Sequence, residues 1–368
     1  MKARWTHTAV TIALGIDYPI LQGPFGGGLS SSRLVAAVSN AGGLGAYGAH
    51  YMAPDAISIL AEEVRRLTSR PFSLNLWVSG HDEGGLNPSR EEFERHIDRF
   101  RPYFEQLGLQ VPIYPERFGY KFEDQIGALL DAAPPVFSFV YGIPEPEVLR
   151  ECRKRGIKTI GAATTVAEAE ALDATGVDLI VASGFEAGGH RTSFLNRPDD
   201  SLVGTFALIP QVVDKVRVPV IAAGGIADAR GIVAAFALGA QAVQIGTAFL
   251  ACEESNASVP HRAMLLSGNT QVTRLTRAFS GRLARGIVNR LMDELRSDEA
   301  DLAPFPVQGW FVSQLKGAAL AQGRTDLLAM WAGQAASLLR HQTVSDLMRA
   351  LTEETTAHYQ QATFDALA

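Results

Sequence analysis

A histidine in a glycine-rich loop is the strongest candidate for acid–base chemistry in this sequence. His190 stands in the run S-G-F-E-A-G-G-H-R over residues 183–191, directly after the apolar stretch 178–183. An imidazole changes its charge near neutral pH, so a histidine held beside a bound ligand can act as a general base. The other histidines lack such a setting. We therefore predict His190 to be the catalytic base.

Two further glycine-containing segments have the features of a phosphate site. Gly224-Gly225-Ile-Ala-Asp228 lies just before a stretch of helical period, and Gln244-Ile245-Gly246-Thr247 belongs to the next apolar run. Glycine lets the backbone approach a ligand closely, and the free N–H groups at the start of a helix bind anions. Either segment alone could be a turn. Together on neighbouring strands they favour a phosphate cradle.

The cradle does not say whether its phosphate belongs to a substrate or to a cofactor. A Schiff-base enzyme needs a lysine at the end of a strand, but Lys158 is at the start of one, and no Asp, Glu and His cluster has metal-ligand spacing. We therefore expect no metal and predict an organic cofactor with a phosphate, for which FMN fits. Asn75, inside the apolar run 72–78, could hydrogen-bond a flavin edge. It could equally be a satisfied core asparagine.

The elements that must position these residues recur along the chain as short apolar runs separated by helical stretches. Alternating strands and helices predict βαβ units with a parallel sheet, and eight of them favour a closed α/β (β/α)8 TIM barrel over a doubly wound sheet. In a barrel the candidate residues would all lie at the carboxyl ends of the strands. The eight runs are 19–22, 44–48, 72–78, 136–142, 159–163, 178–183, 219–223 and 242–249.

Two regions interrupt this rhythm and predict a barrel with a helical subdomain. Residues 80–131 read as an insertion over the barrel top, and 253–324 as a smaller helical lid or substrate subdomain. The FMN-binding barrel would then comprise residues 1–252 and 325–368, with two helices in 326–367 completing its outer ring.

The composition excludes several classes of protein. The 368 residues carry a formal net charge of −6, which argues against nucleic-acid binding because the positive field that attracts phosphate backbones is missing. No uncharged apolar run is long enough to span a membrane. Cys152 and Cys252 are isolated, which argues against a disulfide framework. We expect a soluble, cytoplasmic enzyme.

Several segments together resemble the nitronate monooxygenase family, formerly called 2-nitropropane dioxygenases, which are FMN-dependent TIM-barrel enzymes. The run E-A-G-G-H-R at 186–191 and the two phosphate segments are the most specific part of the resemblance, which covers nearly the whole chain. The segments that carry it are 20–24, 38–45, 75–76, 186–191, 222–228, 244–249, 279–285 and 328–334.

The resemblance implies site residues. It implies that His190 is the catalytic base. The expected cofactor-binding residues are Gln22, Gly23, Asn75, Ser183, Gly188, Gly189, Gly224, Gly225, Gln244, Ile245, Gly246 and Thr247. The chain departs from the family at two points: many members have a glutamine where Ser183 stands, and many have a histidine where Val140 stands. By the same resemblance, Trp331 and Gln334 are expected near the flavin. The alternative is that they pack in the hydrophobic core.

The activity that the resemblance implies is oxidation of an alkyl nitronate or nitroalkane by O2 to a carbonyl compound and nitrite. One alternative keeps the flavin in an NAD(P)H-dependent reductase acting on a quinone or an enoyl thioester. A second alternative is a flavin-free barrel that binds or isomerises a phosphate ligand. Each of these three functions is compatible with a homodimer. Four arginines in the predicted lid could attract an anion, although a solvated basic face is the favoured interpretation; they are Arg274, Arg277, Arg282 and Arg285.

Overall fold

Eight parallel strands close into a barrel in the computed structural model, which describes residues 4–365 except 269, 271 and 298. The strand order in the sheet is β1-β9-β8-β6-β5-β4-β3-β2, and a parallel bridge from Leu21 to Leu44 joins β1 to β2. This bridge excludes the open doubly wound sheet and confirms the predicted (β/α)8 barrel. The strands are β1 (Ile20–Gln22), β2 (Gly45–Gly48), β3 (Phe72–Trp77), β4 (Val136–Val140), β5 (Lys158–Ala163), β6 (Leu179–Ser183), β8 (Val220–Ala223) and β9 (Ala242–Ile245).

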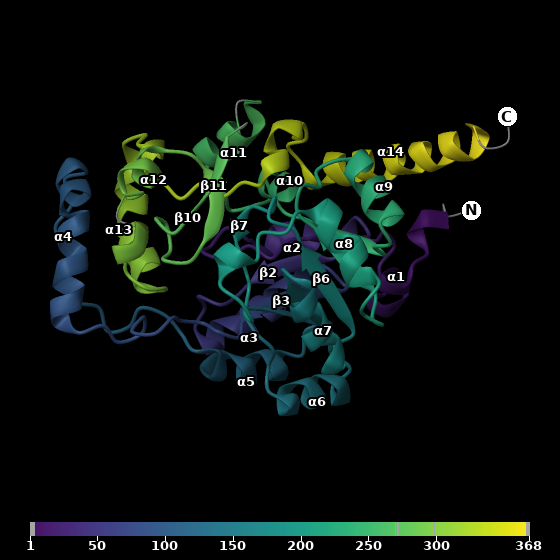
Figure 1. Cartoon of the computed structure of the whole chain (residues 1–368), viewed down its shortest axis with the longest axis horizontal. Helices are drawn as coiled ribbons and strands as arrows, with labels where there is room; N and C mark the ends of the chain where they lie inside the picture. Colours follow the sequence, from purple (N-terminus) through teal and green to yellow (C-terminus); the bar gives the residue numbers. More distant parts are fainter. Residues whose placement is uncertain (1–3, 269, 271, 298, 366–368) are drawn as a thin grey trace.

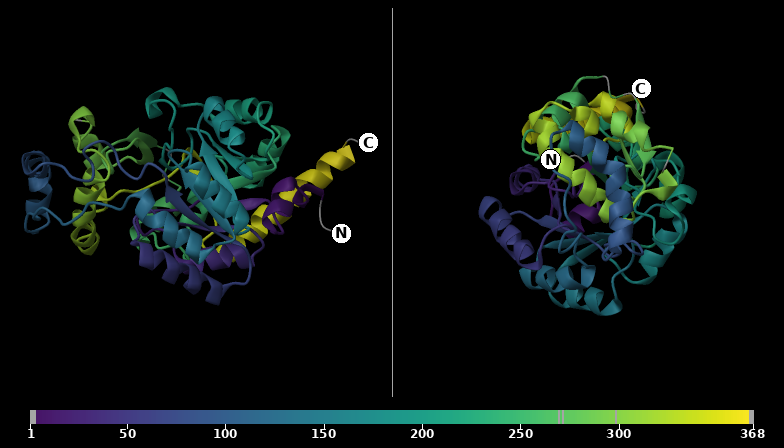
Figure 2. Two further views of the ribbon diagram at one scale, coloured as in Figure 1. Left: turned by 90° about the horizontal axis from the view of Figure 1, so that it is seen from below. Right: turned by 90° about the vertical axis from the view of Figure 1, so that its left-hand side faces the viewer.

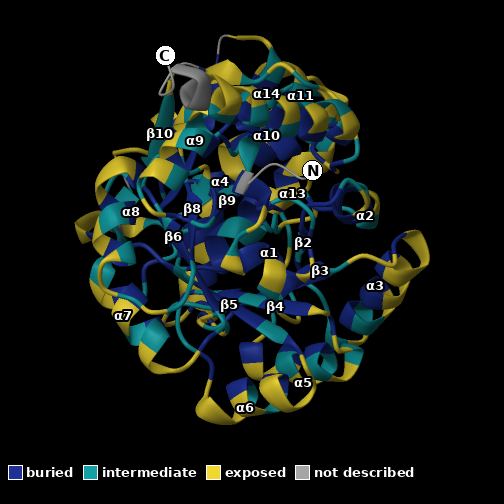
Figure 3. Ribbon diagram, turned by 90° about the vertical axis from the view of Figure 1, so that its right-hand side faces the viewer, coloured by how far each residue is buried: buried dark blue, intermediate teal, exposed yellow. Residues whose placement is uncertain are grey.

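Helices surround the barrel and bury one face each against the strands. Figure 3 shows buried residues along the strands and exposed residues on the outer sides of the helices. Amphipathic helices of this kind place an apolar stripe on the sheet and leave the polar face in water. The surrounding helices are α2 (Ser32–Asn40), α3 (Pro54–Leu67), α5 (Phe122–Ala132), α6 (Pro146–Lys154), α7 (Val166–Ala174), α8 (Thr205–Val213), α9 (Ala229–Ala237) and α14 (Val344–Asp365).

A short helix plugs the amino-terminal end of the barrel. Val10 and Leu14 of α1 (Ala9–Leu14) belong to one buried cluster with the strand residues Leu21, Leu179 and Ile221. The described part of the chain therefore closes this end of the barrel, and the carboxyl ends of the strands are the face that carries function in this fold.

A second layer covers those carboxyl ends. Its apolar cluster includes Phe93, Phe100, Leu291, Phe311 and Leu315, so α4 packs with the segment that follows β9. Figures 1 and 2 show α4 and α13 side by side at the end of the molecule opposite α14. The layer consists of α4 (Arg90–Gln106), α10 (Thr247–Leu250), α11 (Val259–Leu266), α12 (Arg290–Glu294), α13 (Val307–Ala321) and a small sheet of β7 (Gly189–His190), β10 (Thr273–Thr276) and β11 (Ala284–Ile287).

The segment 80–131 divides between the two layers. Its helix α4 joins the second layer, whereas Phe122 and Leu129 of α5 belong to the core of the barrel. The helix α5 therefore takes the place of the barrel helix between β3 and β4. The division of the chain into domains stays a prediction.

Two local predictions were wrong. The last strand ends at Ile245, and residues 247–250 form the short helix α10 instead of continuing the strand. In place of the two predicted helices, the described part of the segment 326–367 holds one long α-helix, α14, preceded by a short 3-10 helix at Gln334–Leu338. The reason lies around Trp331 and Gly333: Trp331 bridges Gly286, and Gly333 donates its N–H to the Thr247 hydroxyl over 2.9 Å. These backbone groups are committed to the second layer and cannot enter a helix.

Among the residues that the structure describes, no helix is both long and apolar enough to cross a membrane.

Candidate functional site

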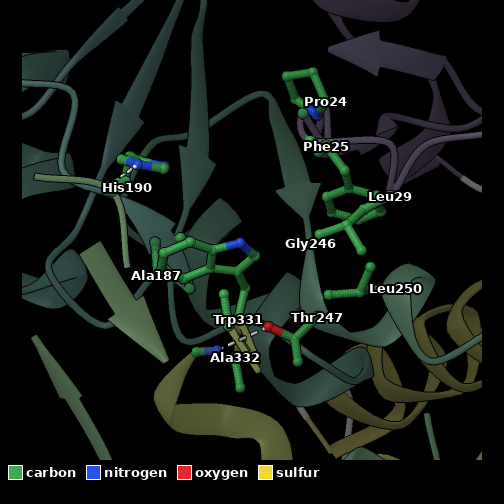
Figure 4. A pocket seen from close by; sticks show the side chains of 18 of the residues that line it. Pro24, Phe25, Leu29, Ala187, His190, Gly246, Thr247, Leu250, Trp331 and Ala332 are labelled. Atoms are coloured by element: carbon green, nitrogen blue, oxygen red, sulfur yellow. Dashed lines mark hydrogen bonds between the residues drawn. The ribbon is translucent and has the colours of Figure 1, made fainter. Parts of the chain in front are cut away.

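A cavity of about 500 Å³ lies between the carboxyl ends of the strands and the second layer. Its size falls in the range of small-molecule sites, about 300–1,000 Å³. Figure 4 shows His190 and Trp331 on one side and Phe25, Leu29 and Leu250 on the other. The predicted residues that line it are Gly23, Asn75, Ser183, Gly188, Gly189, His190, Gly224, Gly225, Gln244, Gly246 and Thr247.

Two of the predicted cofactor-binding residues are not among those that line the cavity. The fully buried Gln22 side chain donates to the carbonyl oxygen of Gly23 and accepts from the N–H of Ala46 over 2.8 Å. Ile245 is also fully buried in the barrel core, and its carbonyl oxygen accepts from the N–H of Gly23 over 2.9 Å. Both residues support the backbone of Gly23 from behind.

The two predicted phosphate segments lie together at one end of the cavity. Gly224 and Gly225 have φ angles of +102° and +70°, which disfavour any residue with a side chain. The backbone N–H groups of Gly224, Gly225, Gly246 and Thr247 donate to no other described residue. Unpaired N–H groups that converge on a cavity form a binding site for an anion. The geometry therefore fits the phosphate of a bound group.

Polar side chains line the cavity beside this cradle. Asn75 is buried and donates from Nδ2 to the Ser138 hydroxyl over 3.1 Å while it also lines the cavity. The asparagine is thus held by a core partner and available to a ligand. The side chains of Gln244 and Ser183 also line the cavity and have no hydrogen bond to the described residues.

The glycine-rich loop 183–190 is fixed from beneath by two buried arginines. Arg191 donates to the carbonyl oxygens of Ser183, Gly184 and Ser201 over 2.8–3.1 Å. Arg285 donates to the carbonyl oxygen of Phe185 over 3.0 Å. Burial is the main cause that lowers the pKa of Arg191 to about 10, so it stays charged at neutral pH. These hydrogen bonds therefore fix the backbone of the loop where it lines the cavity.

A solvated basic face was predicted for four arginines, and this prediction is wrong for two of them. Arg282 and Arg285 are buried, at 8% and 4% exposure. Arg282 donates to Asp82 over 2.8 Å and to the carbonyl oxygen of Ser79 over 2.7 Å. Its guanidinium lies 4.2 Å from the centre of the Tyr141 ring. A buried cation is tolerated here because a carboxylate, a carbonyl and an aromatic face compensate for its lost hydration.

His190 is held in the cavity wall by a strand pairing and one hydrogen bond. It forms β7 with Gly189 and pairs with Ala284 of β11. Its Nε2 lies 2.8 Å from the Ser280 hydroxyl. Burial, and then the charge of Arg282, lower the pKa of His190 to about 3. The imidazole is therefore neutral at physiological pH, so it can accept a proton and cannot serve as a resident acid.

Sequence reasoning missed a second histidine in the cavity. His50 lines it, only 7% exposed, and stacks on Trp77 with ring centres 3.8 Å apart. Burial is the main cause that lowers its pKa well below the usual value, and the charge of Arg282 adds to the effect. A signal was present, because His50 follows directly after the second strand, as catalytic residues do in barrels.

Residues of the second layer complete the cavity. His261 lines it and bonds through Nε2 to the carbonyl oxygen of Trp331 over 3.0 Å. Trp331 itself lines the cavity, whereas Gln334 contributes a backbone N–H bond to the carbonyl oxygen of Glu186. Among the described residues, no group of three or more His, Cys, Asp or Glu could hold a metal ion.

Comparison with known proteins identifies the family. The family model "Nitronate monooxygenase" matches residues 7–354. The chain belongs to the nitronate monooxygenase family. The predicted resemblance is confirmed, and with it an oxidoreductase of this family. A probable nitronate monooxygenase of Staphylococcus haemolyticus is 39% identical over 95% of this chain and 97% of its own length.

Solved structures agree with this family. A nitroalkane oxidase from Streptomyces ansochromogenes is 35% identical, with a TM-score of 0.86 over 97% of this chain and 100% of its own. FabK from Thermotoga maritima is 28% identical, with a TM-score of 0.74 over 97% of this chain and 98% of its own. Both likenesses cover the barrel and the second layer together.

Proposed function

We propose that this member of the nitronate monooxygenase family binds FMN and uses O2 to oxidise alkyl nitronates, and more slowly nitroalkanes, to a carbonyl compound and nitrite. The observation that carries the proposal is the position of His190, with Nε2 2.8 Å from the Ser280 hydroxyl, in the wall of a cavity that also holds an anion cradle. Nitronates and nitroalkanes differ by one proton on carbon, which is what a neutral imidazole could remove.

The donors of the cavity fit FMN. The backbone N–H groups of Gly224, Gly225, Gly246 and Thr247 would hold the phosphate. The ring system would lie against Asn75, Gln244, Ser183 and the glycines 188–189, which line the same cavity. When bound, FMN supplies the redox chemistry, because it accepts electrons from the substrate and passes them to oxygen.

Glycine at two of these positions keeps space for a ligand and for the loop. A Cβ on Gly188 would lie 2.5 Å from the backbone nitrogen of Gly333, so only glycine lets the loop and residues 332–333 pack together. A Cβ on Gly189 would have no neighbour within 4 Å, so this glycine faces open space. The loop thus leaves room beside His190 for a flat molecule.

In the proposed reaction, the proton is accepted by the ring nitrogen of His190 that has no hydrogen-bond partner among the described residues. Ser280 Oγ lies 3.2 Å from the carbonyl oxygen of Arg282 and can donate there, which leaves it to accept from Nε2 of His190. Nδ1 then carries the lone pair, and no described residue bonds it. His190 would accept the α-proton of a nitroalkane at Nδ1.

The low pKa of His190 sets a preference between the two substrates. A base whose conjugate acid has a pKa of about 3 is weak, because the imidazolium would be buried beside the Arg282 charge. A nitronate, by contrast, needs no proton removed. We therefore expect nitronates to be the better substrates.

The test is aerobic turnover of the FMN-loaded protein with nitrite detection. Propane-2-nitronate should yield nitrite with a kcat/KM well above that of 2-nitropropane at the same pH. Equal or higher activity on the neutral nitroalkane would contradict the weak-base assignment. Absence of nitrite from both substrates would contradict the proposed reaction.

The likeness to FabK supports a second candidate, an FMN reductase that takes electrons from NAD(P)H and passes them to a quinone or an enoyl thioester. The two candidates differ in their electron donor. Flavin bleaching by NADH or NADPH, without bleaching by a nitronate, would favour the reductase. The homodimer and the cytoplasmic location stay predictions.

A further inference from the structure

His50 is the feature of the cavity that the proposed reaction leaves unexplained. Both ring nitrogens are buried and have no hydrogen-bond partner among the described residues. Buried polar atoms without partners are rare in proteins because their lost hydration is not replaced. A histidine in this state at the carboxyl end of a barrel strand is expected to meet a ligand.

The backbone of His50 is fixed by a buried glutamine. Gln125 of α5 donates from Nε2 to the carbonyl oxygens of His50 and Met52 over 3.0 and 2.7 Å. The N–H of Ala49 continues the barrel pairing by donating to the carbonyl oxygen of Asn75 over 2.9 Å. The position of the residue is therefore determined by the barrel.

The ring of His50 is fixed as well. It stacks on Trp77 at an interplanar angle of 12°, and the same indole meets His190 edge-on with ring centres 4.9 Å apart. At the Cε1 edge of the ring, between its two nitrogens, Gly26 comes so close that a Cβ there would lie 2.0 Å from the ring. The structure thus places two neutral imidazoles around one indole, with only His190 bonded to the protein.

We propose that His50 is a second substrate-binding residue, whose ring N–H donates a hydrogen bond to an oxygen of the substrate's planar NO2 group. The inference rests on the proposed function. A neutral imidazole always carries one N–H donor, and a negatively charged oxygen is its strongest acceptor. The charge of Arg282 nearby favours the neutral ring.

The test compares three variants of the FMN-loaded protein. His50→Phe keeps a ring on Trp77 and removes the donor, and His50→Gln keeps an N–H donor. His96→Phe is the matched control, because His96 is buried with an unpartnered Nδ1 on α4 and does not line this cavity. Inorganic nitrate serves as the probe, since it is planar and carries the charge of a nitronate.

We expect His50→Phe to weaken nitrate binding, measured by calorimetry, by about tenfold or more, as for a lost hydrogen bond to a charged group. KM for propane-2-nitronate should rise by a similar factor while kcat changes little. His50→Gln should recover most of both effects. His96→Phe should bind nitrate as the unmodified protein does, with equal FMN content.

Several results would overturn the proposal. They are unchanged nitrate affinity in His50→Phe, loss of FMN in place of nitrate affinity, and absence of nitrate binding by the unmodified protein. The outcome is separate from that of the proposed function. If the protein binds nitrate through His50 but makes no nitrite from nitronates, the reaction is wrong while the binding role stands.

Discussion

The two ends of the cavity are built in different ways. The cradle around Gly224 and Gly246 consists of backbone N–H groups from the ends of two adjacent strands, β8 and β9. Another wall consists of the side chains of His50, Trp77 and His190, drawn from distant parts of the chain, and Arg282 packs against Trp77 without lining the cavity. The cradle needs only glycine and local geometry. The wall depends on how buried rings and charges pack together.

This difference decides how each end should respond to change. Damage to the cradle should reduce cofactor binding and spare proton chemistry, whereas damage to the wall should do the reverse. The predictions for His190, Gly224 and Ser183 test that separation, and the prediction for His261 tests the burial of a residue beside the cavity.

The largest effect is expected from His190→Asn, in the wall. Loss of the base should lower kcat/KM for 2-nitropropane about 100-fold, the lower end of the usual contribution of a general base, because this base is weak. Turnover of propane-2-nitronate should fall much less, since no proton is removed. FMN content should not change.

Steady-state kinetics on both substrates with equal FMN loading measures this prediction. His96→Asn, outside the cavity, controls for loss of a buried histidine. An equal fall on both substrates would show that His190 does not act through the α-proton.

Gly224→Ala should damage the cradle. At a φ of +102° the new Cβ would lie 2.9 Å from the carbonyl oxygen of Gly184 and from the Thr205 hydroxyl, so the loop must move. The affinity for FMN should fall about tenfold or more. FMN fluorescence titration measures it, and kcat at saturating FMN should stay near the original value.

Gly127→Ala is the matched control, because a Cβ there has no neighbour within 4 Å. It lies in α5, away from the cavity. If Gly224→Ala bound FMN normally and lost kcat instead, the assignment of the two ends would be reversed.

Low pH should reduce the free energy of unfolding through the buried histidine His261. Burial is the main cause that lowers the pKa of His261 to about 4, below the value of about 6.5 expected in the unfolded chain. Between these values the unfolded state binds more protons, so stability falls as pH decreases from about 6.5 to 4 and levels off below. His261 alone should contribute about 1–2 kcal/mol of loss at pH ~5.

Urea unfolding of the unmodified protein and of His261→Phe at neutral pH and near pH ~5 measures this loss. The free energy of unfolding should depend less on pH in the variant. An unchanged pH dependence would mean that His261 is charged or exposed in the folded state.

The smallest effect is expected from Ser183→Gln, which installs the residue that many family members carry. Ser183 lines the cavity and its hydroxyl bonds no described residue, so we expect a longer amide to reach the bound flavin. One added hydrogen bond should increase FMN affinity by roughly twofold to tenfold. Weaker binding would show that the cavity has no room for the longer side chain.

The barrel and the cradle could be predicted from the sequence because both follow from local patterns. Apolar runs marked the strands, a glycine pair after one of them marked Gly224, and the run that contains Gly246 lay beside it. Gln22 and Ile245 were misplaced because residues that alternate along a strand point to opposite sides, and pattern alone did not show which side.

The wall could be predicted only in part. His190 stood in a recognisable loop, but the partners of Arg282 are Asp82 and Ser79, some 200 residues earlier. Nothing local distinguishes such a buried arginine from the partly exposed Arg274 and Arg277 near it, so a solvated face was expected. The orphaned ring of His50 likewise depends on Trp77 and Gly26, which only the folded chain brings together.

Anaerobic titration of the FMN-loaded protein with propane-2-nitronate, and separately with NADH and NADPH, tests the central claim most directly. We predict that the nitronate bleaches the visible flavin band, that the nicotinamides leave it unchanged, and that nitrite accumulates when air is admitted. Bleaching by NADH or NADPH but not by the nitronate, with no nitrite formed, would contradict the account.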